Sequence, residues 1–144
     1  MKLTPEIYEH FKYEEGYKRA AYRDTHGYWT IGNGHFLGAD PKYRGLVWTD
    51  EQIKAAFEKD FAIAVKDAAS VFPGQWESFS PNVKLAITDM VFNLGIGGFK
   101  KFKNTIALIA AHKFQQAADN AMKSLWAKQV PNRAQRTTDK LRKG

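Results

Sequence analysis

The chain has 144 residues, no cysteine and a formal net charge of +7, and 44% of its residues are hydrophobic. These values exclude a disordered chain, a disulfide framework and a site built on cysteine thiolates, and they suit one folding unit. The basic balance favours an anionic partner, which could be nucleic acid, an acidic membrane surface or a polyanionic cell wall.

The N-terminal third of the sequence predicts a helix followed by a small antiparallel sheet. Thr4 and Pro5 are typical of a helix start, and Gly16 is a natural stop. Aromatic and β-branched residues over 19–37, interrupted by a glycine turn, predict strands. Residues 38–48 contain Gly, Asp and Pro and therefore predict a loop.

The remainder of the sequence predicts helices only. Thr49, with a glutamine three residues later, forms a capping box, and apolar residues follow at helical spacing over 49–70. Ser80 and Pro81 predict the start of another helix, which Gly95 would close. Shorter helices are expected at 104–112, 114–127 and 132–141.

We therefore expect an α+β fold, mainly α, in a single domain. Its predicted parts are an N-terminal α+β lobe (1–48), a connecting helix (49–70) and a helical C-terminal lobe (71–144). The longest apolar run, Ile106 to Ala111, is too short to cross a bilayer. Several acidic residues near the N-terminus are not typical of a signal peptide.

Two carboxylates and a threonine lie on three successive predicted elements. Glu15 ends the first helix, Asp24 lies in a polar turn, and Thr30 lies on the returning strand. Glycoside hydrolysis needs one carboxylic acid to protonate the leaving oxygen and one carboxylate to activate water. Desolvation beside aromatic residues suits Glu15 to the acid role, whereas a polar turn keeps Asp24 ionised. By spacing alone, ordinary surface charges are the commoner explanation, because any basic protein of this size carries many such pairs.

The segment from Glu15 to His35 resembles the active-site segment of phage lysozymes of the T-even type. That family has a glutamate, eight residues, an aspartate, five residues, a threonine and then Gly-His, and the spacing here is the same. Further stretches resemble the family in the same order: Thr49–Asp60, Met90–Gly95 and Trp126–Arg136. Several matches in order are much more specific than a lone motif.

The resemblance implies a lysozyme-like fold and an inverting muramidase. Such an enzyme hydrolyses the β-1,4 bond between N-acetylmuramic acid and N-acetylglucosamine in bacterial peptidoglycan. Glu15 would be the general acid, and Asp24 and Thr30 would position and activate water on the opposite face of the sugar. The two carboxyl groups of an inverting enzyme stand about 6.5–9.5 Å apart. The resemblance implies no cofactor and no metal.

The resemblance also assigns substrate contacts and structural residues. The positions that contact sugar in the family are Phe36, Phe92, Thr105 and Asn120. For Phe92, which lies on an apolar helix, core packing is the alternative. His35 would pair with Asp60. Arg133 would approach Glu15, where a cation favours the ionised acid and burial favours the protonated one.

Three features depart from the T-even pattern. The loop over 38–48 is shorter, Asn93 stands near the site where the T-even enzyme has glutamine, and little sequence follows Arg136. We expect these differences to affect the rim of the cleft and the docking of the lobes more than the chemistry.

The resemblance implies a phage endolysin that lyses its bacterial host. Its partner would be peptidoglycan, and we expect neither nucleic acid binding nor an integral membrane segment. The protein would be a monomer, held in the host cytoplasm until a holin opens the membrane and then active in the periplasm and cell wall.

Other functions stay open at this point. A lytic transglycosylase cleaves the same bond without water, but Asp24 and Thr30 argue against it because both would serve to hold water. A catalytically silent wall-binding protein of the virion would have no need of Glu15, Asp24 and Thr30 together. A nucleic-acid binder ranks lowest, since the lysines and arginines form no dense block.

Overall fold

The computed structural model describes residues 1–144, and its contacts divide the chain into two compact units. One unit is Lys2–Ala62, and the other consists of Met1 together with Ile63–Gly144. The boundary falls within the long helix α2 (Asp50–Val71). None of the helices has both the length and the hydropathy of a membrane-crossing segment.

Helix α1 (Pro5–Glu15) opens the first unit and confirms the helix predicted from Thr4 and Gly16. The Thr4 hydroxyl accepts a hydrogen bond from the Ile7 amide at 3.2 Å, which satisfies one of the unpaired donors of the first turn. Gly16 ends the helix with a φ of +85°, a conformation that favours glycine.

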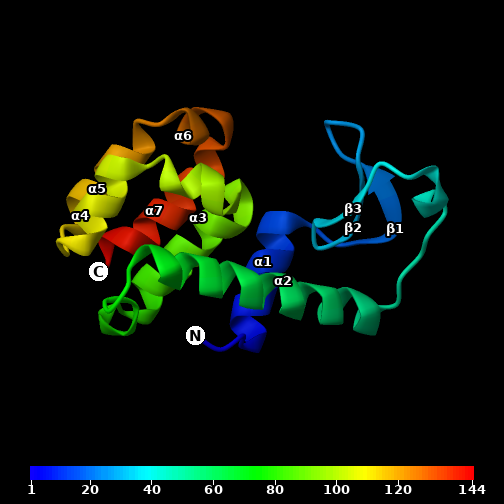
Figure 1. The fold of residues 1–144 in the computed structure, drawn as a ribbon, viewed down its shortest axis with the longest axis horizontal. Helices are drawn as coiled ribbons and strands as arrows, with labels where there is room; N and C mark the ends of the chain where they lie inside the picture. The colour runs from blue at the N-terminus through cyan, green and yellow to red at the C-terminus, as the bar shows by residue number, and fades with distance from the viewer. The chain divides into compact units, whose positions relative to one another are not determined.

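A three-stranded antiparallel sheet follows α1, as the sequence predicts. The strands are β1 (Lys18–Arg23), β2 (Trp29–Gly32) and β3 (His35–Gly38), in that spatial order (Figure 1). The predicted loop after β3 contains one short 3-10 helix, η1 (Pro41–Tyr43). An isolated bridge between Ala20 and Val47 ties the end of this loop back to β1.

Aromatic rings form much of the core of the first unit. The ring of Phe11 on α1 lies 5.5 Å from that of Phe57 and 5.8 Å from that of Phe61, both on α2. All three rings are buried. The capping box at the start of α2 is present, because the Thr49 amide donates to Gln52 Oε1 at 2.9 Å.

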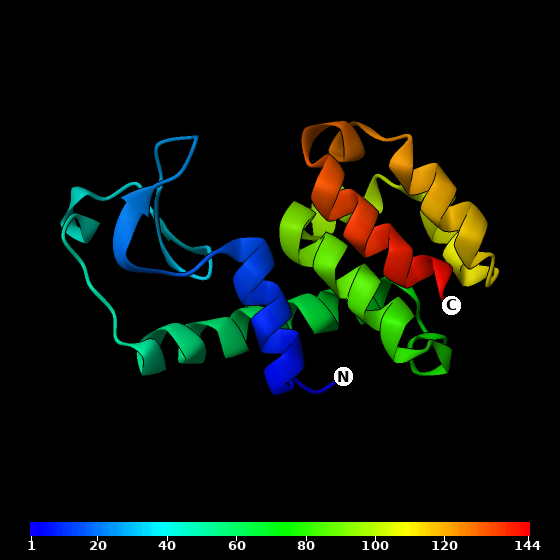
Figure 2. The ribbon, with the colours of Figure 1, turned by 180° about the vertical axis from the view of Figure 1, so that it is seen from behind.

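The second unit is helical, with α7 in the middle of its helices. It holds the part of α2 from Ile63 onward, then η2 (Trp76–Ser78), α3 (Pro81–Lys100), α4 (Lys103–Ala110), α5 (Phe114–Met122), α6 (Leu125–Gln129) and α7 (Pro131–Arg142). Helix α7 packs against α3, α5 and α6 (Figures 1 and 2). A continuous apolar cluster fills the space between these helices.

Two predicted helices of this unit differ from the structure. Gly95, with φ +72° and ψ +162°, breaks the helix as predicted, but a further helical turn continues from it to Lys100. The single helix predicted over 114–127 is wrong, because α5 ends at Met122 and α6 begins at Leu125. Ser124 causes the break, since its hydroxyl accepts a hydrogen bond from the Ala127 amide and caps α6.

Candidate active site

Glu15 is the last residue of α1 and lies against the turn between β2 and β3. Its side chain is half-buried. A Cβ placed on Gly34 of that turn would lie 3.4 Å from Glu15 Oε2 and 3.8 Å from Glu15 Cβ. Gly34 also has a φ of +73°, which favours glycine. The turn therefore presents bare backbone to the carboxyl group.

Asp24 occupies the turn between β1 and β2. Its Oδ1 accepts hydrogen bonds from the backbone amides of His26 and Tyr28, each at 2.9 Å. These two bonds fix the direction of the carboxylate. Its second oxygen, Oδ2, accepts no hydrogen bond from the protein. The site thus holds a carboxylate with one oxygen anchored and one available to a water.

Thr30 lies in the middle strand and is 6% exposed. Its cross-strand neighbours are Tyr22 on β1 and Phe36 on β3. Because the pairs of a sheet lie directly opposite one another, Thr30 has a fixed place between these two residues. No hydrogen bond commits its hydroxyl to another side chain, so the hydroxyl can serve a ligand or a water.

The Tyr22 hydroxyl lies near the carboxylates of both Glu15 and Asp24. Burial raises the pKa of the Tyr22 hydroxyl, and the negative charges of Glu15 and Asp24 raise it further. Both carboxylates therefore lie within electrostatic reach of one phenol, although eight residues of chain separate them. The sequence predicted Glu15, Asp24 and Thr30 as one group, and the structure places all three around Tyr22 in the same unit.

An exposed aromatic pair stands next to this group. Phe36 is 60% exposed and Tyr28 is 42% exposed, and their ring centroids lie 5.4 Å apart. Phe36 pairs with Thr30, and the Tyr28 amide binds Asp24. Large exposed rings on a rigid hairpin are suited to the apolar face of a sugar. Phe36 was predicted from the sequence, whereas Tyr28 was not.

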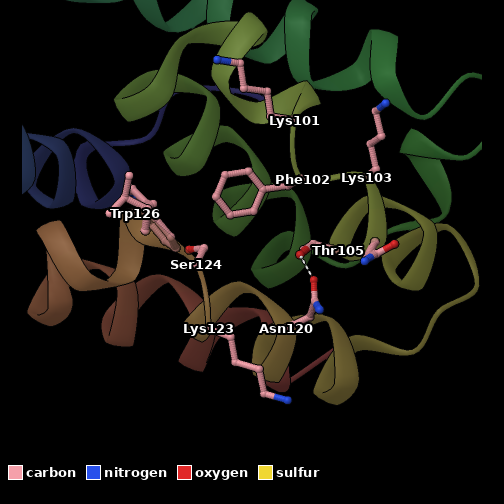
Figure 3. A pocket seen from close by; sticks show the side chains of 10 residues that line it. Lys101, Phe102, Lys103, Thr105, Asn120, Lys123, Ser124 and Trp126 are labelled. Atoms are coloured by element: carbon pink, nitrogen blue, oxygen red, sulfur yellow. Dashed lines mark hydrogen bonds between the residues drawn. The ribbon is translucent and has the colours of Figure 1, made fainter.

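A solvent-open groove of about 570 Å³ lies in the helical unit, and it contains Thr105 and Asn120 (Figure 3). Thr105 Oγ1 donates to Asn120 Oδ1 at 2.7 Å near the middle of the groove. The rings of Phe102 and Trp126 meet edge to face beside them, with centroids 6.1 Å apart. Thr105 is 1% exposed and Trp126 is 4% exposed, so they support Asn120 and Phe102, which are partly exposed. Asn120 and Phe102 offer a polar group and aromatic surface of the kind that binds saccharides.

Three lysines lie at the edge of this groove, and we refer to them as the rim lysines. They are Lys101, Lys103 and Lys123. All three are exposed, and Figure 3 shows their amines on different sides, directed away from the middle. None of them forms an ion pair, and no acidic residue lines the groove. The groove therefore has an uncompensated positive rim that attracts anionic ligands.

The other predicted contacts of this unit lie elsewhere. Asn93 Oδ1 accepts a hydrogen bond from Trp126 Nε1 at 2.7 Å, so it supports one wall of the groove from behind. Phe92 is partly buried and packs against the apolar core cluster. It does not line the groove. Core packing is therefore the role that the structure shows for Phe92.

His35 and Asp60 form the predicted pair, which joins β3 to α2. Nδ1 of His35 lies 2.7 Å from Oδ2 of Asp60, and both side chains are about one-third exposed. The hydrogen bond to Asp60 raises the pKa of His35, and partial burial opposes this shift. The Trp48 ring packs beside the imidazole, at 5.6 Å between centroids.

Arg133 has a buried partner that the sequence did not predict. Arg133 Nε donates to Asp89 Oδ1 at 3.1 Å, and Thr137 donates to Asp89 Oδ2 at 3.2 Å. Asp89 is 1% exposed and Arg133 is 8% exposed. Buried charges require such pairing, so this cluster anchors α7 to α3. The expected approach of Arg133 to Glu15 stays a prediction.

Comparison with known proteins identifies the family. The family model described as phage lysozyme matches residues 12–142, which is most of the chain. The chain belongs to the phage lysozyme family. Its predicted membership and its α+β, mainly helical fold are thus both confirmed.

Individual phage lysozyme relatives come from phages and from a eukaryote. "Probable T4-type lysozyme 1" of Dictyostelium discoideum is 30% identical, covering 99% of this chain and 96% of that protein. "Pre-baseplate central spike protein Gp5" of Enterobacteria phage T4 is 30% identical over 90% of this chain and 26% of its own length. "Peptidoglycan hydrolase gp36" of Pseudomonas phage phiKMV is 28% identical over 84% of this chain and 13% of its own. The same lysozyme domain thus occurs alone and within larger proteins.

Besides Tyr28, the sequence did not predict roles for Tyr22, Asn33 and Asp89 of this phage lysozyme domain. Tyr22 is one of the aromatic residues that predict strands over 19–37, and Asn33 stands between two glycines. Asp89 lies in an otherwise apolar stretch of α3, and a charge in such a place is a usable signal for a buried ion pair. Tyr22 and Asn33 gave no comparable signal.

Proposed function

We propose that the protein is a muramidase that hydrolyses the β-1,4 bond from N-acetylmuramic acid to N-acetylglucosamine in peptidoglycan. The observation that carries this proposal is the grouping of Glu15, Asp24 and Thr30 around Tyr22 in a chain of the phage lysozyme family. Two carboxylates from different elements are the usual equipment for cleaving a glycosidic bond.

The proposed reaction is a single displacement with inversion. Glu15, in its protonated form, donates its proton to the glycosidic oxygen as the bond to the anomeric carbon breaks. Asp24 takes a proton from a water that its free oxygen and the Thr30 hydroxyl hold in place. That water forms the new bond on the opposite face of the sugar. The anchoring of Asp24 Oδ1 by two amides supports this role, since the carboxylate needs no reorganisation during the reaction.

The proposed substrate contacts follow from the two exposed surfaces. The Phe36 ring, together with Tyr28, packs on the apolar face of a sugar near the reacting bond. Asn120, held in place by the hydrogen bond from Thr105, contacts hydroxyl or acetamido groups in the groove of the helical unit. The net charge of +7 and the rim lysines favour an anionic wall polymer.

The proposed biological role is that of a phage endolysin. In this role the monomer stays in the host cytoplasm until a holin opens the membrane and then degrades the cell wall. Relatives from phages support this origin, although the family also includes proteins of Dictyostelium discoideum. The test is expression in the bacterial cytoplasm without a holin. The cells should keep growing, and rapid lysis would contradict the proposed dependence.

The experiment that tests the activity is mass spectrometry of the fragments released from purified peptidoglycan. The protein and its Glu15→Gln variant are compared. Fragments ending in a reducing muramic acid, from the unmodified protein only, are expected. Anhydro-muramic ends would instead assign a transglycosylase. If neither protein releases fragments, the enzymatic reading is wrong and a wall-binding role replaces it.

A further inference from the structure

Asn33 is a buried polar residue in the turn between β2 and β3, and both ends of its amide are in use. It is 3% exposed. Its Nδ2 donates to the Gly16 carbonyl at 2.8 Å, and its Oδ1 accepts from the Tyr8 hydroxyl at 3.1 Å. Tyr8 lies on α1, and Gly16 directly follows this helix. The Asn33 side chain therefore links the turn both to α1 and to the residue that ends it.

These contacts involve the backbone on either side of the Glu15 side chain. Gly16 directly follows Glu15, and its positive φ takes the chain out of the helix there. The Asn33 amide is the partner of the Gly16 carbonyl, so it fixes the direction in which the backbone leaves Glu15. On the other side, Gly34 directly follows Asn33 and lies against the Glu15 carboxyl group. Asn33 therefore sets the distance between the end of α1 and the backbone that Glu15 faces.

The Tyr8 hydroxyl remains a hydrogen-bond donor to a higher pH than an ordinary tyrosine does. Burial raises the pKa of the Tyr8 hydroxyl, and the nearby charges of Glu9, Asp50 and Glu58 raise it further. The ring is held by Phe57, at 5.1 Å between centroids. The Gly16 carbonyl can only accept, so it takes the Asn33 nitrogen and leaves the Asn33 oxygen to accept from the Tyr8 hydroxyl.

We propose that Asn33 is the positioning residue for Glu15, holding the acid at the place from which it protonates the glycosidic oxygen. This inference rests on the proposed function, in which Glu15 is the general acid. The effect is geometric: a misplacement of roughly 1 Å can cost about 100-fold in rate even when no reacting group is removed. Asn33 itself touches no substrate in this role.

The test compares variants that remove one or both hydrogen bonds. Asn33→Leu removes both, Asn33→Asp keeps an acceptor for Tyr8 and loses the donor to Gly16, and Tyr8→Phe removes only the Tyr8 bond. The control is Phe61→Leu, which destabilises the core of the same unit and removes no hydrogen bond. The readouts are kcat and KM on soluble glycan fragments, well below each thermal midpoint, together with the midpoint itself.

A positioning role predicts a separation of kcat from KM. Asn33→Leu and Asn33→Asp should lower kcat about 10- to 100-fold with KM within about twofold of the original value. Tyr8→Phe should have a smaller effect in the same direction. Phe61→Leu should lower the midpoint and leave kcat unchanged. If Asn33→Leu fails to fold, Asn33→Asp, which has almost the same size, gives the answer.

Two failures can be told apart because Glu15→Gln is measured in the same series. If Glu15→Gln is inactive while both Asn33 variants keep their kcat, Asn33 is purely structural and this inference alone is overturned. If Glu15→Gln keeps its activity, the proposed function is wrong, and the positioning role for Asn33 is overturned with it.

Discussion

The His35–Asp60 pair gives the most quantitative prediction, because the distance between the two side chains and the direction of the His35 pKa shift are both known. Replacing His35 by Asn should destabilise the protein at acidic pH and have much less effect at alkaline pH. The hydrogen bond to Asp60 raises the pKa of His35 above its ordinary value of 6.5, which the unfolded chain is taken to have. A pKa that is higher in the folded state means that the protonated pair stabilises the fold. That stabilisation is complete below about pH 6.5 and is lost as the pH rises through the folded pKa.

The expected magnitude lies between those of exposed and buried pairs. The two side chains are 32% and 29% exposed, and the atoms are 2.7 Å apart. Exposed pairs contribute about 0.2–1 kcal/mol, whereas breaking a buried pair costs about 3–5 kcal/mol. With solvent screening at this exposure, we expect about 1–2 kcal/mol. For a chain of this length, that corresponds to a fall of about 3–6 °C in Tm.

The assay is thermal unfolding of the original protein and of His35→Asn at about pH 5 and about pH 9. Asp60→Asn serves as the matched variant, and it should show the same dependence because it removes the same pair. The difference in Tm should be several degrees at the lower pH and should shrink at the higher one. If the difference in Tm is equal at both pH values, or larger at about pH 9, the protonated pair does not stabilise the fold.

Three more predictions concern the site, the buried pair and the groove. Thr30→Val should lower kcat about 100-fold or more with little change in stability, because it replaces the hydroxyl proposed to hold water by a methyl group of similar size. Asp89→Ala should destabilise the protein by about 3–5 kcal/mol in urea unfolding, because it removes the buried carboxylate that pairs with Arg133. Replacing the rim lysines by alanine should raise KM on peptidoglycan and flatten its salt dependence, with kcat on short fragments unchanged.

Each of these predictions has a matched control. Thr30→Ser keeps the hydroxyl and should stay active, so equal losses in both variants would contradict the water-holding role. Asp119 pairs with Arg142 at the surface, and Asp119→Ala should cost less than about 1 kcal/mol. Three exposed lysines elsewhere serve as the control for the rim: Lys59, Lys66 and Lys128. If their removal has the same effect, total charge rather than the groove determines binding.

The sequence predicted local structure well where one residue alone decides it. Thr4 and Pro5 began α1, and Gly16 ended it, because capping and positive φ are properties of single residues. The break between α5 and α6 was missed because Ser124 acts there without a neighbouring glycine or proline. Its hydroxyl competes for the backbone, and nothing in the apolar pattern shows which of several serines does so.

Contacts between distant residues explain what the sequence could not predict. Asn33 meets Gly16 across 17 positions, and Asp89 meets Arg133 across 44. Neither contact follows from spacing, since only the packed chain brings the partners together. The site residues Glu15, Asp24 and Thr30 could be proposed from a motif, but the anchoring of Asp24 by two amides appears only in the structure.

We propose that Glu15 acts with a water held by Asp24 and Thr30. The anomeric configuration of the first product tests this mechanism directly. Proton NMR can follow a soluble peptidoglycan fragment from the moment of mixing, before the sugar ring equilibrates. The α-anomer of the new reducing end should appear first, and Glu15→Gln should give no product. Early formation of the β-anomer, or of an anhydro sugar, would contradict attack by a water on the opposite face.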